Sequence, residues 1–269
     1  MGRFPFLPMR FLHSRIGSMG NELPILQIGW KLFHEDHQMA MQDNLYLHEE
    51  IMLLAMRDEE GTIASGTMYQ YAIGAAVLAE LLLNQSIAVD QSGKRKLVDL
   101  VSSTPLGEPL LDHCLEKITT AKRRATLQTW VSRFSGVKNL KHRVAQRLCA
   151  RGILRADEDK VLLIFTRKIY PEVNPEPERK LIERLRQAIF TDAPDVDPRT
   201  VVLVSLANSA SLLRVVFDKK MLKARKARIE QIVNGDITGK AAQEAIQAMQ
   251  AAVMVAIMMP AIMTTTIHH

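Results

Sequence analysis

The chain has 269 residues, of which 47% are hydrophobic and 24% charged. These are ordinary globular proportions, so they exclude extensive disorder and allow a core for one domain or two small ones. The net charge of +6 indicates that any large partner surface is acidic, whether nucleic acid, anionic lipid head groups or an acidic protein. Cys114 and Cys149 have no CxxC spacing, which argues against a disulfide framework and a structural zinc site and favours a reducing cytosolic compartment.

Residues 1–43 form a basic extension that we expect to be partly flexible. Pro5 and Pro8 interrupt its apolar run too early for a signal-peptide core, and Met41 offers an alternative start. His34 and His37 could share one helix face, but no third ligand is evident. We therefore predict a solvated polar turn there, with no metal site and no cofactor.

The first strong helix pattern lies within residues 45–61. Leu47, Ile51 and Leu54 recur at helical spacing, and Glu49 and Glu50 occupy the first turn, where the helix dipole favours acids. Residues 57–61 then read as a turn.

A second helix, over residues 68–83, is apolar on nearly all sides, so it should lie in the middle of the domain. Its Gly74 permits close packing of another helix. A short hairpin is expected around residues 91–93, and two amphipathic helices follow. Their inward residues are Leu110, Leu111, Leu115 and Ile118 in the first and Leu127, Trp130, Val131 and Phe134 in the second.

Residues 138–151 predict a basic helix closed by Gly152. The chain continues into an acidic turn at residues 157–159 and an apolar strand at residues 161–165, an order that also describes a winged-helix unit. Further helices are expected beyond the proline-rich loop, among them residues 201–217 and the strongly basic stretch 219–228.

The most hydrophobic segment, residues 251–263, has 13 residues and contains Pro260. A membrane-spanning helix needs about 20 residues, so no transmembrane span is predicted. We expect a domain over residues 44–260 and a tail over residues 261–269. The predicted fold class is mainly α, a single globular helical domain with a central buried helix bundle and short β-hairpins.

The compact catalytic motifs (Walker loop, GxGxxG, GxSxG and HExxH) are absent from the sequence. Glu49, Glu50 and Glu80 could supply a carboxylate pair for acid-base chemistry. We favour a structural role, in which the first two stabilise a helix start and Glu80 pairs with a nearby lysine or arginine. Trp130 is expected to be a core anchor and not a binding platform.

Two groups of basic residues are candidate anion sites. Lys138, Lys141 and Arg143 begin a helix whose N-terminal amides carry partial positive charge, a combination that suits phosphate. A merely solvated face is the alternative. The denser cations of residues 219–228 suit an anionic membrane as well as nucleic acid, and there we favour a solvated face.

Seven sequence blocks, in the same order and at similar spacing, resemble the Golgi phosphoprotein 3 family over residues 44–257. They are LYLHEEIMLLAMRDEEG, GAAVLAELLLNQSI, LLDHCLEKI, LQTWVSRFSG, RVAQRLCARGIL with its LLIF strand, ERKLIERLRQAIF and VVLVSLANSASLL. The resemblance implies a mostly helical, non-enzymatic peripheral membrane protein that binds phosphatidylinositol 4-phosphate. For a eukaryotic member it also implies the cytosolic face of the Golgi, where such proteins retain glycosyltransferases through coat proteins.

The lipid pocket that the resemblance implies is only partly retained. Lipid-binding members use a tryptophan in the loop after the first helix and three arginines. Here the loop at residues 62–67 has Ser65 or Gly66 in that place, and Gly74 replaces one arginine. Lys138 and Lys141 replace the other two, keeping the charge without the bidentate geometry. We therefore expect an altered or weakened lipid specificity.

The family's hairpin, which inserts apolar side chains into the membrane and supports self-association, aligns with residues 157–168. The resemblance thus assigns membrane contact to Val161, Leu162, Leu163 and Ile164, and self-association to the hairpin 153–168. The acidic residues 157–159 would be repelled by an anionic leaflet, which argues against deep insertion.

Three functions compete on the sequence alone. The first is a peripheral membrane protein that holds a phosphoinositide-type head group with Lys138, Lys141 and Arg143. The second is a winged-helix-like nucleic-acid-binding protein that uses residues 138–151 and 153–168, and we favour lipid over nucleic acid as the partner. The third, an enzyme, lacks a recognisable constellation of partners for its carboxylates.

Overall fold

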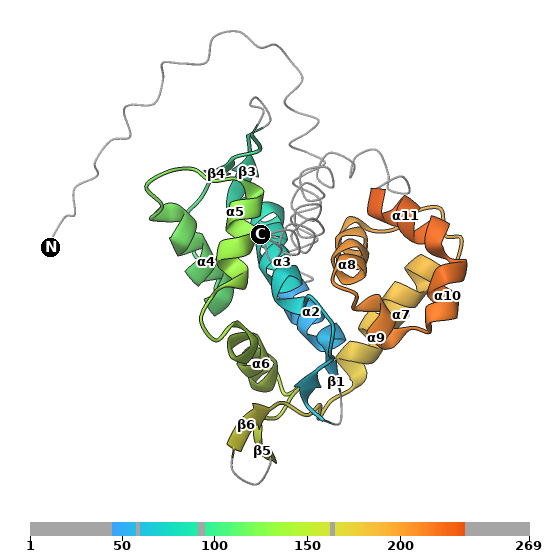
Figure 1. Cartoon of the computed structure of the whole chain (residues 1–269). Helices are drawn as coiled ribbons and strands as arrows, with labels where there is room; N and C mark the ends of the chain where they lie inside the picture. The colour runs from blue at the N-terminus through green and yellow to red at the C-terminus, as the bar shows by residue number, and fades with distance from the viewer. Residues whose placement is uncertain (1–44, 58–59, 91–94, 162–164, 235–269) are drawn as a thin grey trace, which may run out of the picture. The chain divides into compact units, whose positions relative to one another are not determined.

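The computed structural model describes residues 45–57, 60–90, 95–161 and 165–234. Figure 1 shows these parts as helices joined by short hairpins. The helices are α2 (Leu47–Ala55), α3 (Tyr69–Leu83), α4 (Pro109–Thr119), α5 (Leu127–Ser135), α6 (Leu140–Ala150), α7 (Glu176–Phe190), α8 (Pro198–Ser209), α9 (Leu213–Val216), α10 (Lys219–Ala224) and α11 (Lys226–Asn234). The strands form three antiparallel pairs: β1 (Met56–Arg57) with β2 (Thr62–Ile63), β3 (Ile87–Val89) with β4 (Val98–Leu100), and β5 (Asp157–Val161) with β6 (Phe165–Ile169). The mainly α fold class is confirmed.

Helix α3 is the central element of the fold. Every residue from Ala72 to Leu83 is buried, and the helix packs against α2, α4, α5 and α8. A helix that is apolar all round can be covered only by neighbours on every side. The position predicted from residues 68–83 is confirmed.

Helix α2 is buried along its whole length, including its polar first turn. The backbone N–H of Tyr46 donates to Glu49 Oε2 at 2.9 Å, and the N–H of Leu47 donates to Glu80 Oε1 at 2.6 Å. Two amides that a helix start leaves unpaired thus find carboxylate acceptors. Glu49 stabilises the helix start, as predicted.

Helices α4 and α5 turn their apolar faces inward as the sequence predicts. Glu108 begins α4 by accepting the amides of Leu110 and Leu111 at 2.9 and 2.6 Å, and the Thr126 hydroxyl accepts the Thr129 amide at the start of α5. Trp130 is 1% exposed and packs on Phe134, so its predicted role as a core anchor is confirmed.

The expected helix over residues 201–217 is wrong in its extent. Helix α8 ends at Ser209, and Ser211 has a left-handed backbone with φ of 62° before the short α9 begins. An α-helix cannot continue through a left-handed residue, so the chain reverses there.

The basic stretch 219–228 contains two kinds of cation. Arg225 Nε donates to the carbonyl of Ile189 at 2.9 Å, and one Arg228 nitrogen donates to the carbonyl of Ala193 at 2.6 Å. These arginines satisfy backbone groups at and just beyond the end of α7. The lysines of the stretch are exposed, so the solvated-face interpretation holds for them alone.

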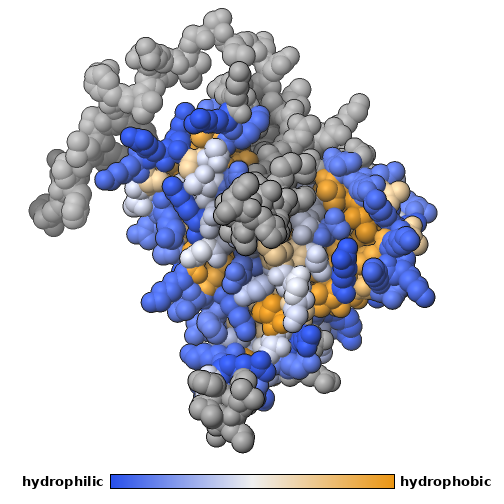
Figure 2. Space-filling view, viewed as in Figure 1, coloured by the Kyte–Doolittle hydropathy of each residue, from blue (hydrophilic) through white to orange (hydrophobic). Residues whose placement is uncertain are grey.

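No helix among the described residues is long and apolar enough to cross a membrane. The segments 34–37 and 251–263, for which predictions were made, lie outside the described residues. On the face shown in Figure 2, hydrophilic residues cover much of the surface around α4 and α6, whereas hydrophobic residues gather beside α7 to α11.

Candidate functional site

The candidate anion site lies where the chain enters α6. Asn139 has a left-handed backbone with φ of 58°, and the helix begins only at Leu140. Lys138 therefore precedes the helix and is exposed, which corrects the predicted start at residue 138. Lys141 lies in the first turn, where the helix dipole favours anions close to it.

Lys141 is half-buried against an aromatic ring. Its Nζ lies 6.0 Å from the centroid of the Tyr170 ring, and the Tyr170 hydroxyl is 2.9 Å from His142 Nδ1. Burial lowers the pKa of Lys141, and the positive charge of Arg167 lowers it further. An anion bound here would offset both effects, because it would stabilise the charged lysine.

Strand β6 brings more positive charge to the same place. Burial lowers the pKa of His142, and the charges of Lys141 and Lys168 add to this effect. The positive charges of Arg167 and Lys168 therefore act on the first turn of α6, which the sequence alone did not predict. The sequence does contain a signal, because two adjacent cations stand one residue after the apolar segment 161–165.

Arg143 is placed differently from the two lysines. One of its terminal nitrogens donates to the carbonyl of Pro109 at 3.1 Å, at the start of α4. The guanidinium thus connects α6 to α4, and only its remaining N–H groups are available to a ligand.

The hairpin after α6 is real, but its parts differ from the prediction. Asp157 to Val161 form strand β5, and Val161 pairs with Phe165, so the acidic residues lie in a strand and not in the turn. Arg155 pairs with Asp157 at 3.2 Å and Arg167 with Asp159 at 2.7 Å. These ion pairs balance the charges of Asp157 and Asp159 within the strand, so the two acids are stable in extended backbone.

The apolar residues assigned to membrane contact cannot all be placed. Leu162, Leu163 and Ile164 lie outside the described residues. Val161 is the last residue of β5, where only its backbone is described. Their sequence position is nevertheless clear, because they join two strands that pair at Val161 and Phe165.

The base of the hairpin is fixed to the helical core. The backbone N–H of Tyr170 donates to the carbonyl of Gly61 at 2.9 Å. Gly61 has φ of 58°, and a Cβ at this position would lie 2.4 Å from the backbone N of Pro171. Only glycine combines this positive φ with the absence of a Cβ, so it allows the backbone at Gly61 to approach that of Tyr170 and Pro171.

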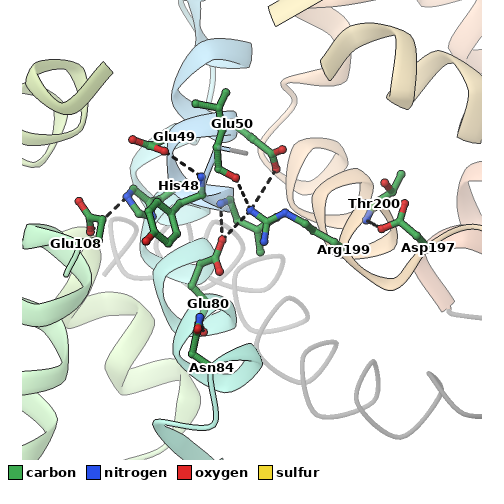
Figure 3. Close-up of polar contacts among 12 residues, drawn as sticks. His48, Glu49, Glu50, Glu80, Asn84, Glu108, Asp197, Arg199 and Thr200 are labelled. Carbon is green, nitrogen blue, oxygen red and sulfur yellow. Dashed lines mark hydrogen bonds and ion pairs between the residues drawn. The ribbon is translucent and has the colours of Figure 1, made fainter. Parts of the chain in front are cut away.

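Two of the carboxylates considered for catalysis, Glu50 and Glu80, lie in a buried ionic cluster, shown in Figure 3. One Arg199 nitrogen, from α8, donates to Glu80 Oε1 at 2.8 Å and to the carbonyl of Leu45 at 2.6 Å. Arg184, from α7, donates to Glu50 Oε1 at 2.6 Å. Burial raises the pKa of Glu50, although the charges of Arg199 and Arg184 oppose the shift. The predicted pairing of Glu80 with a basic residue is confirmed, and the cluster ties α2 and α3 to α7 and α8.

Comparison with known proteins agrees with this arrangement. The family model for Golgi phosphoprotein 3 (GPP34) matches residues 47–249. The chain belongs to the Golgi phosphoprotein 3 family. It is also similar to vacuolar protein sorting-associated protein 74 of Schizosaccharomyces pombe, with 22% identity over 245 residues, 74% of this chain and 72% of the relative.

At Gly74, which the resemblance aligns with an arginine, helix packing leaves no room for a side chain. A Cβ at Gly74 would lie 2.6 Å from Ser135 Oγ and 2.8 Å from the carbonyl oxygen of Val131. These are contacts with α5, one of them with its backbone, so α3 and α5 approach too closely for any side chain. Position 74 therefore serves helix packing here.

The loop at residues 62–67, to which the resemblance assigns a tryptophan position, is open at residues 65 and 66. Ser65 and Gly66 are both exposed, and nothing lies within 4 Å of a Cβ built on Gly66. Gly66 also has φ of 76°, a backbone conformation that a tryptophan rarely adopts. The loop thus offers no aromatic surface at residues 65 and 66.

Proposed function

We propose that this chain is a non-enzymatic, peripheral membrane adaptor of Golgi trafficking that holds an anionic, phosphoinositide-type lipid head group at the start of α6. Lys138 and Lys141 supply the charge, with Arg167 and Lys168 of β6 beside them. Arg143 positions α6 against α4 and contributes its free N–H groups. The proposal rests on family membership and on the way these cations gather.

The observation that carries the proposal is the half-buried Lys141. Its Nζ lies 6.0 Å from the centroid of the Tyr170 ring, and the charge that lowers its pKa is that of Arg167, a cation that also pairs with Asp159. A lysine held partly out of water beside another cation is destabilised unless an anion joins it. A phosphomonoester, with two negative charges, suits this position better than a carboxylate does.

The hairpin β5–β6 extends the proposal to the membrane. Its acids Asp157 and Asp159 are paired with arginines, so the repulsion expected from an anionic leaflet is reduced. The apolar residues 161–164 then provide the contact with the bilayer, and the same hairpin is the proposed surface for self-association.

Liposome flotation tests the proposal. Vesicles of phosphatidylcholine, alone or with phosphatidylinositol 4-phosphate, phosphatidylserine or phosphatidic acid, distinguish head-group recognition from general charge attraction. We expect flotation with the phosphomonoester lipids and its loss when Lys138→Glu is combined with Lys141→Glu. A Lys141→Gln variant removes the charge with less risk to folding and should weaken binding in the same direction.

The matched control is Lys219→Glu with Lys220→Glu, two exposed lysines at the start of α10. It changes the net charge equally but lies outside the proposed site. Equal loss of flotation in both double variants would refute a specific site. Strong binding to duplex DNA with a steep dependence on salt, and none to vesicles, would replace the lipid by nucleic acid.

A further inference from the structure

A second basic region lies at the opposite end of α4 from Arg143. The last turn of α4, the connection that follows and the helix α5 enclose an open hollow of about 650 Å³. It is lined by Lys117, Ala121, Lys122, Arg123, Trp130 and Arg133.

The charge of this hollow is unbalanced. Four of the six lining residues are cations, and the lining contains no acid. All four cations are exposed, and none forms an ion pair with an acidic side chain among the described residues. The adjacent Arg124 behaves in the ordinary way, because it pairs with Asp99 at 2.8 Å and with Asp90 at 3.2 Å. In the connection between α4 and α5, acids therefore lie within reach of Arg124, whereas Arg123 and Arg133 of the hollow form no ion pair with a described acid.

Trp130 forms one wall of the hollow. Its ring is buried, and the guanidinium carbon of Arg133 lies 4.6 Å from the ring centroid, which holds that cation at the edge of the hollow. Its Nε1 is buried and has no hydrogen-bond partner among the described residues. Because this donor is covered by the chain, the four exposed cations are the groups that a ligand in the hollow would meet.

We propose that this hollow binds phosphate groups, carried by a phosphorylated small molecule or by a lipid head group. Arg123 and Arg133 can each bind a phosphate through two N–H groups, and Lys117 and Lys122 add point charges. The site is separate from the one at α6. Arg143 contacts Pro109 at the start of α4, whereas Lys117 lies eight residues further on, about 12 Å along the helix.

Tryptophan fluorescence gives a direct readout at the hollow. The chain has two tryptophans, so Trp30→Phe leaves Trp130 as the only one. We expect pyrophosphate, titrated at constant ionic strength, to change the Trp130 emission with saturation. In the same background, Lys122→Ala with Arg123→Ala should raise the Kd at least about tenfold, because two charge-assisted contacts are lost. Both residues lie in an exposed connection, so the fold should be retained, which circular dichroism checks.

Lys219→Ala with Lys220→Ala is the matched control, since it removes the same charge from two exposed lysines at the start of α10, outside both proposed sites. Its Kd should stay within about twofold of the parent. Vesicles of phosphatidylcholine with phosphatidic acid distinguish a lipid ligand from a soluble one. A change in Trp130 emission with these vesicles, but not with phosphatidylcholine alone, supports a lipid head group. A response to pyrophosphate and not to the vesicles supports a soluble phosphorylated ligand. Absence of saturation, or equal weakening in both double variants, would overturn the proposal.

Discussion

Replacing Arg199 by methionine should destabilise the fold strongly, because it breaks one side of a buried ionic cluster. Glu80 is completely buried, and one of its oxygens accepts N–H groups from Arg199 and from Leu47. In Arg199→Met the carboxylate keeps only the amide. An uncompensated buried charge of this kind costs about 3–5 kcal/mol. For a domain of this size the midpoint of thermal unfolding should fall by roughly 6–20 °C.

The pH dependence distinguishes this cause from a simple loss of packing. Arg199 opposes the effect of burial on the pKa of Glu50 and also carries the charge that pairs with Glu80. Without it, the pKa of Glu50 in the folded protein should rise further, because Arg184 is then the remaining arginine that opposes the effect of burial. The folded state then binds protons that the unfolded state releases, so acidification stabilises the variant relative to the parent. The difference in unfolding free energy between variant and parent should therefore shrink as the pH falls from neutral towards the ordinary pKa of glutamate, about 4.3.

Urea denaturation followed by circular dichroism measures both quantities. Arg179→Met is the control, because its partner Glu176 lies at the exposed surface and such pairs contribute at most about 1 kcal/mol. A loss below about 1 kcal/mol in Arg199→Met would refute the reasoning. So would a loss that stays constant with pH, since a cavity alone does not titrate.

Three further predictions concern single positions. Gly74→Arg introduces the arginine that the resemblance aligns with this position. It should destabilise the fold by at least about 1–3 kcal/mol and leave flotation unimproved, because the new side chain meets the α5 backbone; increased lipid binding would contradict this. Arg228→Ala should lower the unfolding free energy by about 1–3 kcal/mol through lost carbonyl contacts, whereas Lys223→Ala should change it by less than about 0.5 kcal/mol. Burial raises the pKa of Cys114 to about 12, so a thiol reagent at neutral pH should modify only Cys149 until the protein unfolds; modification of both thiols at similar rates in the folded state would oppose this.

The helical core could be predicted because many apolar residues in each helix indicate the same buried position. The run of apolar residues in α3 leaves no polar face, and a helix of that kind can only be central. The inward faces of α4 and α5 follow from the spacing of their leucines in the same way.

The errors at α6 and its hairpin have physical causes. Asn139 takes a left-handed conformation that delays the helix by two residues, and a single asparagine is a weak signal for it. Residues 157–159 were assigned to a turn because aspartate favours turns. The pairing of Asp159 with Arg167 stabilises them in a strand, and this partner is eight residues away.

The basic residues could not be sorted from the sequence. Arg225 and Arg228 face the end of α7, whereas Lys223, in the same run, is exposed. Likewise, Arg123 and Arg124 are neighbours, but only the second finds acids. The direction of each side chain decides whether it reaches an acid or a carbonyl group. This direction is set by the folded structure and cannot be read from the sequence.

Tyr170 joins the hairpin to the rest of the molecule by two routes at once. Its amide is held by Gly61, next to the central helices, and its hydroxyl meets His142 on α6. The hairpin is therefore fixed to the helical core at its base, while the far ends of its strands extend away from this attachment. A load applied at the far end of β5 and β6 would be transmitted to α2 and α6 together, so the domain would tilt as a unit over any surface that the hairpin touches.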